Sequence, residues 1–156
     1  MKNKMRRMVK KGFTLVELIV VLAIIMIFTG ASAASLSGFD HKQVTKAASL
    51  FDEQLGILRT YATTRAGTWE LELTEEDGQY VTRLRVDGMD ISRTEIGSTS
   101  KVALKQPLPG SRFCVNREDG AFLENETYFC GDVIFQGGGG EKTVKMIKET
   151  GAHYVE

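Results

Sequence analysis

Cysteine, proline and histidine are scarce in this sequence. Its 156 residues include two Cys, two Pro and two His. So few cysteines exclude a small scaffold held by several disulfides, and so few prolines exclude a proline-rich linker. Hydrophobic residues make up 42% of the chain, which is too much for wholesale disorder. The length fits one ordinary folded domain.

An excess of one sign of charge is also missing, because 20 Lys and Arg balance 20 Asp and Glu. The balance differs along the chain: residues 1–12 carry six bases and no acid, so residues 13–156 carry 14 bases and 20 acids. Without its first 12 residues the chain has a net charge of minus six. This excludes a protein-wide basic surface for nucleic acid, although it leaves room for a local basic patch.

The longest stretch without a charged residue covers residues 18–39. A helix of that length, at about 1.5 Å per residue, reaches across the apolar core of a bilayer. Residues 18–28 are strongly apolar, whereas residues 29–35 are small and only weakly hydrophobic. We therefore expect a membrane-inserted helix.

Three interpretations account for a basic start followed by an apolar helix. A secretory signal peptide would be cleaved after Ala33, where Ala31-Ser32-Ala33 fits an A-x-A site, and would release a globular binding protein. A signal anchor would keep the basic residues on the cytoplasmic side. Neither explains Glu17, because an acidic residue costs up to roughly 2.5 to 3.5 kcal/mol near the centre of a bilayer and needs a partner.

The residues around Glu17 support the third interpretation. The run Lys11-Gly12-Phe13-Thr14-Leu15-Val16-Glu17-Leu18 resembles the processing site of type IV pilins and pseudopilins. The resemblance implies that a prepilin peptidase cuts after Gly12 and methylates the new amino terminus at Phe13. It also implies that Glu17 pairs with the Phe13 amine of a neighbouring subunit, so that two charges buried in an apolar filament core satisfy each other.

The residues beyond Gly38 predict an amphipathic continuation of the same helix. Apolar side chains recur at steps of three and four, and no proline stands between Phe13 and Arg65. The apolar stripe consists of Val44, Ala47, Ala48, Phe51, Leu55, Leu58 and Ala62. We expect this stripe to pack against the protein's own sheet.

After Gly67 the apolar period changes from helical to alternating. Residues 69–74 and 80–86 alternate around a turn at Glu75-Glu76-Asp77-Gly78, which predicts a hairpin. Further short strands are expected at residues 101–104, 112–115, 128–130, 133–135 and 143–147, the last of which is alternatively a helix. The expected fold class is α+β, with a long N-terminal helix packed on an antiparallel β-sheet head.

These elements predict three parts of the chain. Residues 1–12 are a basic prepilin leader that is removed, residues 13–66 are the N-terminal helix with its transmembrane first half, and residues 67–156 are an extracytoplasmic β-rich head. The spacing of Arg59, Ala62 and Leu71, with Val133-Ile134-Phe135 entering a run of glycines, is loosely similar to H-type minor pseudopilins of type II secretion and to FimT-like minor pilins.

Cys114 and Cys130 each fall in an expected strand and would face an oxidising compartment. A disulfide between them would close a loop of about 15 residues and contribute roughly 3 kcal/mol in the chain-entropy model. Two buried free thiols are the alternative. A metal site is disfavoured, because neither His41 nor His153 has ligand spacing to the cysteines, and no cofactor is expected.

Side chains for catalysis are not grouped in the sequence. The two histidines lie far apart, and the neighbouring carboxylates of Glu75 and Glu76 belong to a turn. The glycines at 137–140 suggest a phosphate-binding loop, but Glu141 separates the last of them from Lys142, so the motif fails. We expect no enzyme.

The resemblance implies a pilin-like structural subunit, a minor pilin or pseudopilin, of a type IV pilus, type II secretion or competence filament. Its implied partners are other pilin or pseudopilin subunits, the prepilin peptidase, and a membrane assembly platform with its ATPase. Its implied location is the cytoplasmic membrane, crossed once with the head outside the cytoplasm, and then an extracytoplasmic filament. A filament tip subunit that binds DNA or cargo is the nearest variant, and the secreted binding protein is the rival.

Overall fold

The computed structural model describes the backbone of residues 14–156 and the side chains of residues 14–26 and 41–156. In this part of the chain one helix, α1 (Leu15–Thr64), precedes eight strands. The strands are β1 (Trp69–Glu76), β2 (Gln79–Val86), β3 (Met89–Ser98), β4 (Ala103–Gln106), β5 (Ser111–Cys114), β6 (Val133–Gly137), β7 (Gly140–Ile147) and β8 (Ala152–Val155). The chain divides into two compact units, Met1–Leu36 and Ser37–Glu156, so the second half of α1 belongs with the strands in the head.

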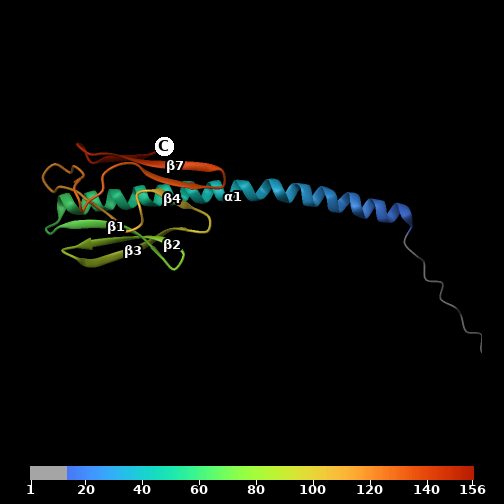
Figure 1. Ribbon diagram of the computed structural model, residues 1–156, viewed down its shortest axis with the longest axis horizontal. Helices are drawn as coiled ribbons and strands as arrows, with labels where there is room; N and C mark the ends of the chain where they lie inside the picture. The colour runs from blue at the N-terminus through green and yellow to red at the C-terminus, as the bar shows by residue number, and fades with distance from the viewer. Residues whose placement is uncertain (1–13) are drawn as a thin grey trace, which may run out of the picture. The chain divides into compact units, whose positions relative to one another are not determined.

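The strands of the head form two antiparallel sheets of four strands each. The first sheet has the order β3-β2-β1-β5, and the second has the order β4-β6-β7-β8. In Figure 1 the second half of α1 lies between β7 on one side and β1 to β3 on the other. The predicted α+β class with an antiparallel sheet region is confirmed, and the strands are shared between two sheets rather than one.

The predicted apolar stripe of α1 is confirmed as the centre of the core. All seven of its residues are at most 2% exposed. The ring of Phe51 packs edge to face on Phe113 of β5, with centroids 5.3 Å apart, and on Phe135 of β6, with centroids 5.9 Å apart. One helical side chain therefore contacts both sheets, and burying a side chain of this size stabilises the fold by about 1.5 to 3 kcal/mol.

The predicted hairpin at residues 69–86 is confirmed as β1 and β2. Its turn is tighter than expected, because Asp77 and Gly78 alone connect the strands, with φ of 50° and 73°. Positive φ at both residues is typical of a type I′ turn. Asp87 and Gly88 repeat this geometry, with φ of 48° and 82°, and lead into β3, which was not predicted.

One strand prediction is wrong, one alternative is decided in favour of a strand, and one strand was not predicted. Residues 128–130 form no strand, because Tyr128 makes only an isolated bridge to Arg112. Residues 143–147 lie within β7, so this segment is a strand and not a helix. The last strand, β8, was not predicted and pairs with β7.

The glycine run at 137–140 is a tight connection between β6 and β7, in which Gly137 pairs with Gly140. A Cβ atom on Gly137 would lie 2.2 Å from the carbonyl oxygen of Lys101. The backbone approach at this point therefore leaves no room for a side chain. The glycine at 137 is therefore required for packing between this connection and Lys101.

Candidate functional site

The predicted processing residues, Gly12 and Phe13, lie outside the described residues. The description begins at Thr14, which caps the first turn of α1. Its Oγ1 accepts a hydrogen bond from the backbone N–H of Glu17 at 3.3 Å, and its carbonyl accepts one from Leu18 at 3.2 Å. Such a cap satisfies backbone donors that the first turn of a helix leaves without partners.

Glu17 lies in the first turn of α1, and its side chain is exposed. A carboxylate at this point is favoured by the partial positive charge of the helix N-terminus, by about 0.3 to 1 kcal/mol at an exposed position. Thr14 and Glu17 also have the spacing of a capping box. That spacing was readable in the sequence and was missed, and the structure shows one half of the motif, the hydrogen bond from the Glu17 N–H to Thr14 Oγ1.

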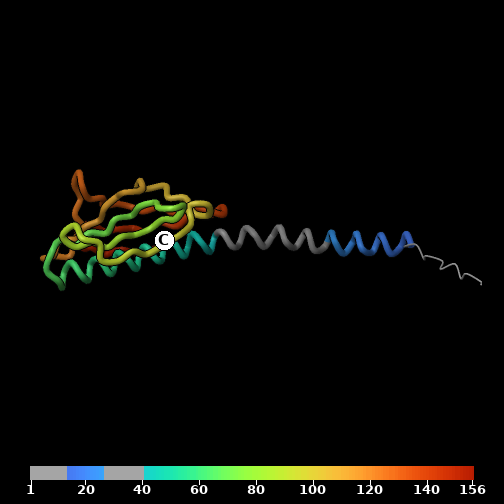
Figure 2. Tube along the Cα trace, turned by 90° about the horizontal axis from the view of Figure 1, so that it is seen from below, coloured from blue at the N-terminus to red at the C-terminus, as the bar shows by residue number. Residues whose placement is uncertain are grey.

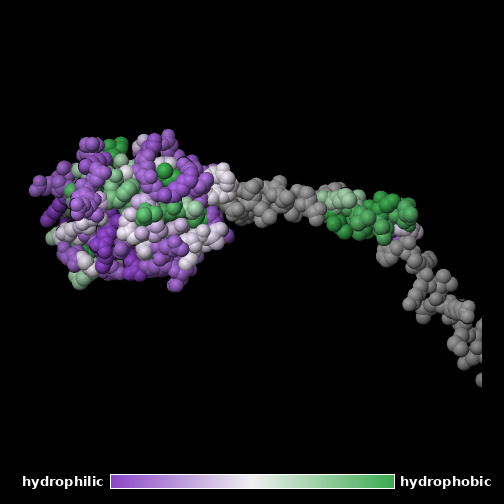
Figure 3. Space-filling model, viewed as in Figure 1, coloured by the Kyte–Doolittle hydropathy of each residue, from purple (hydrophilic) through white to green (hydrophobic). Residues whose placement is uncertain are grey.

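The side chains that follow Glu17 present an apolar surface. Leu15 is 76% exposed and Met26 is 71% exposed, and the large apolar side chains between them are 46% to 68% exposed. Figure 3 shows this described segment in green, whereas the visible surface of the head is largely hydrophilic. An exposed apolar surface of this kind marks a contact with a membrane or another protein.

Within the described residues, no helix satisfies the length and hydropathy of a membrane span. The side chains of residues 27–40, which include the whole second half of the predicted span and the Ala31-Ser32-Ala33 sequence, lie outside the description.

Cys114 and Cys130 are free thiols in the structure, so the predicted disulfide is not formed in it. Cys114 is buried at the end of β5, where burial and then the carboxylate of Glu70 raise the pKa of its thiol to about 11. Cys130 is half-buried, and burial followed by the charge of Glu124 raises the pKa of its thiol. Both thiols are therefore protonated at neutral pH, and the disulfide stays a prediction.

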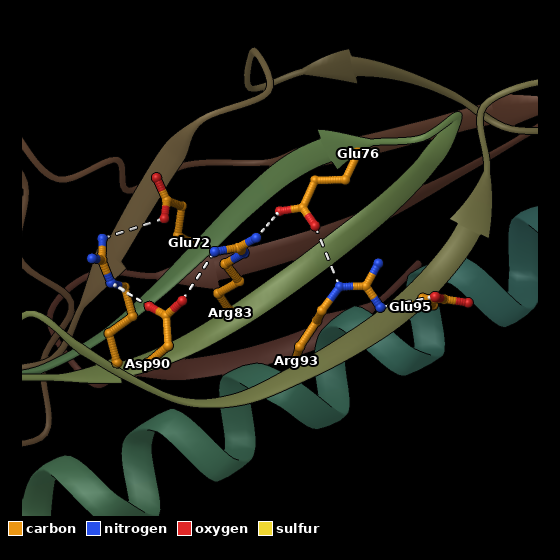
Figure 4. A network of polar contacts seen from close by, with 7 residues as sticks. Glu72, Glu76, Arg83, Asp90, Arg93 and Glu95 are labelled. Atoms are coloured by element: carbon orange, nitrogen blue, oxygen red, sulfur yellow. Dashed lines mark hydrogen bonds and ion pairs between the residues drawn. The ribbon is translucent and has the colours of Figure 1, made fainter.

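A chain of ion pairs covers the face of the first sheet opposite α1. Arginine and carboxylate side chains alternate along it, with closest N–O distances of 2.6 to 3.6 Å. Figure 4 shows its central part across β1, β2 and β3. In order, the chain consists of Arg112, Glu72, Arg85, Asp90, Arg83, Glu76, Arg93 and Glu95.

Each arginine in this network already has a carboxylate partner. The Nε of Arg85 lies 2.9 Å from Asp90 Oδ1 without being directed at it, so this contact is an ion pair and not a hydrogen bond. Exposed pairs of this kind each contribute about 0 to 1 kcal/mol. Because the charges balance, this face does not offer the surplus positive charge that phosphate groups attract.

The histidine at position 153 joins the last strand to the helix. Its Nδ1 lies 2.7 Å from Oδ1 of Asp52 on α1. The two residues are 101 positions apart in the sequence, so this pair was not predicted. In the described part of the chain, no group of three or more His, Cys, Asp or Glu side chains is placed to hold a metal ion.

Residues 7–33 match the family model described as the prokaryotic N-terminal methylation motif. This is the type IV prepilin-like leader, so the resemblance seen around Glu17 is confirmed. Such a leader implies processing by a prepilin peptidase and assembly with other pilin-like subunits. The matched residues contain Gly12, Phe13 and Glu17 and end before the head. No curated protein and no solved structure matches the chain.

Proposed function

We propose that this chain is a pilin-like structural subunit, a minor pilin or pseudopilin, of a type IV pilus, type II secretion or competence filament. The observation that carries the proposal is the methylation motif at residues 7–33. In this proposal the chain is cut after Gly12, is methylated at Phe13, and enters an extracytoplasmic filament. Its role is mechanical and not enzymatic.

Removal of the first 12 residues changes how the chain is held in the membrane. These residues carry six bases, which keep the amino-terminal end on the cytoplasmic side. Cutting after Gly12 removes these charges and leaves an apolar helix with a single new amine. The exposed apolar side chains of residues 15–26 support this step, because they supply a surface for lipid first and for neighbouring subunits later.

Glu17 has its proposed role after cutting. Its carboxylate pairs with the Phe13 amine of a neighbouring subunit, and the two charges leave water together when the apolar helices associate. Loss of one member of a buried ion pair typically costs about 3 to 5 kcal/mol, because the other charge stays buried without a partner. The exposure of Glu17 in the single chain is consistent with a partner supplied by another subunit.

The remaining partners and the location follow from the same proposal. The subunit crosses the cytoplasmic membrane once, with its head outside the cytoplasm, and a membrane platform with its ATPase drives assembly. A tip subunit that binds DNA or cargo is a variant of this role. DNA binding by such a tip subunit has less support than cargo binding, because the arginines on the first sheet are paired with carboxylates and leave no surplus positive charge for phosphate groups.

The test is to replace Glu17 by Ala and by Gln in cells that assemble the filament. We expect both variants to be cut normally and to remain in the membrane, while their amount in the sheared filament fraction falls. Glu75→Ala, which removes an exposed carboxylate in the head, is the matched control and should assemble normally. Wild-type amounts of Glu17→Ala in sheared filaments would contradict the proposed pairing.

A further inference from the structure

The C-terminal end of α1 borders a hollow at one end of the head. In Figure 1 and in Figure 2 this end of the helix lies at the same end of the head as the orange loop that follows β5. The hollow between them measures about 520 Å³, within the range of roughly 300 to 1,000 Å³ that is typical of small-molecule sites. We call it the arginine hollow. Its lining consists of Arg59, Thr60 and Thr63 from α1 and Arg117, Glu118, Asp119 and Gly120 from the loop.

The backbone around Arg59 holds its guanidinium group in place. Nη2 of Arg59 donates a hydrogen bond to the carbonyl oxygen of Thr150 at 2.8 Å. Its Nε lies against two turns, because a Cβ on Gly120 would be 3.3 Å from it and a Cβ on Gly151 would be 3.2 Å from it. A cation that is already ordered loses little conformational freedom when it binds an anion, so its position favours binding.

The two arginines of the hollow have no carboxylate partner in the described part of the chain. Arg59 is half-buried and contacts only the carbonyl oxygen of Thr150, and Arg117 is exposed and has neither a hydrogen bond nor an ion pair there. The arginines on the first sheet differ, because each of them contacts at least one carboxylate. Guanidinium groups bind carboxylates with strong, often paired hydrogen bonds. The hollow therefore offers two cations to an anionic ligand.

The hydroxyl groups of the hollow are available as acceptors. Oγ1 of Thr60 donates its hydrogen to the carbonyl oxygen of Gly56 at 2.8 Å, and Oγ1 of Thr63 donates to that of Arg59 at 2.9 Å. A hydroxyl that has used its hydrogen within the helix can still accept a hydrogen bond on its oxygen. A ligand that donates hydrogen bonds therefore suits the helical side of the hollow.

The loop adds two carboxylates in an ordered turn. Oδ1 of Asp119 accepts the backbone N–H of Ala121 at 3.0 Å, and the backbone N–H of Glu118 donates to Oδ1 of Asn116 at 3.1 Å. Neither carboxylate forms an ion pair with a described residue. An ionised carboxylate only accepts hydrogen bonds, so the loop side also suits a ligand with donors.

This combination of groups selects among the classes of ligand. The carboxylates of Glu118 and Asp119 repel a polyanion such as DNA. Among the described residues that line the hollow, none has the large apolar or aromatic side chain that usually anchors a protein partner. An acidic sugar fits, because its carboxylate accepts hydrogen bonds from guanidinium groups while its hydroxyl groups donate to carboxylate and threonine oxygens.

We propose that the arginine hollow binds a uronic acid unit of an acidic glycan. The sugar carboxylate contacts Arg59 and Arg117, and the sugar hydroxyl groups contact Glu118 and Asp119. This role goes beyond the proposed function, because it depends on the head alone and not on entry into a filament.

Calorimetric titration of the full chain with a galacturonic acid trimer tests the proposal. The chain is kept in a polyoxyethylene detergent, which contains no sugar. We expect the trimer to bind, and we expect a neutral galactose trimer, which lacks the carboxylates, to bind at least about tenfold more weakly. Absence of binding by the galacturonic acid trimer, or equal affinity for the two trimers, would overturn the proposal.

Substitutions locate the binding. We expect Arg117→Gln to lower the affinity for the galacturonic acid trimer by about tenfold and to leave the urea midpoint unchanged, because Arg117 has no partner in the described head. Arg65→Gln is the matched control. Arg65 is an exposed arginine that lies over the Tyr61 ring, 4.1 Å from its centroid, outside the lining of the hollow. Equal loss in both variants, or no loss in Arg117→Gln, would place the binding elsewhere and overturn the proposal.

Selectivity tests the role of the loop carboxylates. Glu118→Gln removes a negative charge, so we expect it to raise the affinity for inorganic phosphate relative to the galacturonic acid trimer. If the wild-type chain binds inorganic phosphate or a glutamate tripeptide more tightly than the galacturonic acid trimer, the assignment to acidic sugars is wrong. None of these results depends on filament assembly, so the proposed function stands or fails separately.

Discussion

Oγ1 of Thr14 lies 3.3 Å from the backbone nitrogen of Glu17 and caps the helix that starts at Leu15. The cap begins one residue after Phe13, the residue that the proposed cut after Gly12 would make the mature amino terminus. Cutting after Gly12 would therefore leave the cap intact. The same few residues thus combine the processing motif with the start of the helix that the proposed filament needs.

Loss of the Thr14 hydroxyl should loosen the start of α1. Replacing a capping threonine by alanine typically costs about 0.5 to 2 kcal/mol of helix stability. We expect Thr14→Ala to speed amide hydrogen exchange at Glu17 and Leu18, measured by mass spectrometry on the full chain in detergent. Thr14→Ser retains the hydroxyl and should exchange like the wild type. Equal exchange in Thr14→Ala and wild type would show that the cap does not hold this turn.

A side chain at Gly137 should destabilise the head more than one at Gly140. A Cβ at Gly137 would lie 2.2 Å from a backbone oxygen of Lys101, which is fixed, whereas a Cβ at Gly140 would meet the exposed ring of His41. We expect Gly137→Ala to lower the free energy of unfolding by about 1 to 3 kcal/mol, and Gly140→Ala by less. Urea unfolding of the full chain in detergent measures both, and the opposite ranking would contradict the packing of the hairpin.

Much of the head follows from periodicity in the sequence. The stripe from Val44 to Ala62 and the alternation around Leu71 and Leu84 specify which side chains face the core, and all of these residues except some at the strand ends are buried. These patterns are local, so they are readable without knowledge of distant contacts.

The strands β3 and β8 were not predicted from the sequence. β3 follows a turn signal that was overlooked, and β8 depends on contacts with residues far away in the chain. Asp87-Gly88 is a strong hairpin signal and predicts β3 once it is recognised. β8 is four residues long, and its contact with α1 through His153 and Asp52 spans 101 residues. The cross-strand pairing of Glu72 with Arg83 required the register of β1 and β2, which the sequence alone did not give.

Glu76 should be more sensitive to substitution than Glu95 in the ion-pair network, because Glu76 contacts both Arg83 and Arg93 whereas Glu95 contacts Arg93 alone. We expect Glu76→Gln to lower the free energy of unfolding by up to about 1 kcal/mol, and Glu95→Gln, which loses one pair at the end of the network, to have a smaller effect. The difference should shrink in high salt, because screening weakens exposed pairs. A cost for Glu76→Gln that does not change between low and high salt would contradict this electrostatic origin.

The two cysteines should differ in reactivity if they are free. The pKa of the Cys114 thiol is raised to about 11, mainly by burial, so little of it is thiolate at pH 8, and the fraction rises tenfold per pH unit below that pKa. We expect iodoacetamide to modify half-buried Cys130 before Cys114 in the folded chain, measured by peptide mass spectrometry. The chain is also unfolded without a reductant and treated with iodoacetamide. If neither cysteine reacts then, Cys114 and Cys130 are joined in the predicted disulfide, and the expectation of two free thiols is wrong.

The mass of the amino-terminal peptide tests the central claim most directly. The chain is recovered from the membrane and from sheared filaments, digested, and analysed by tandem mass spectrometry. A pilin-like subunit predicts a first residue of Phe13 that carries one methyl group on its amine. A chain that begins at Ala34 would identify an ordinary signal peptide and a secreted protein, and would contradict the filament account.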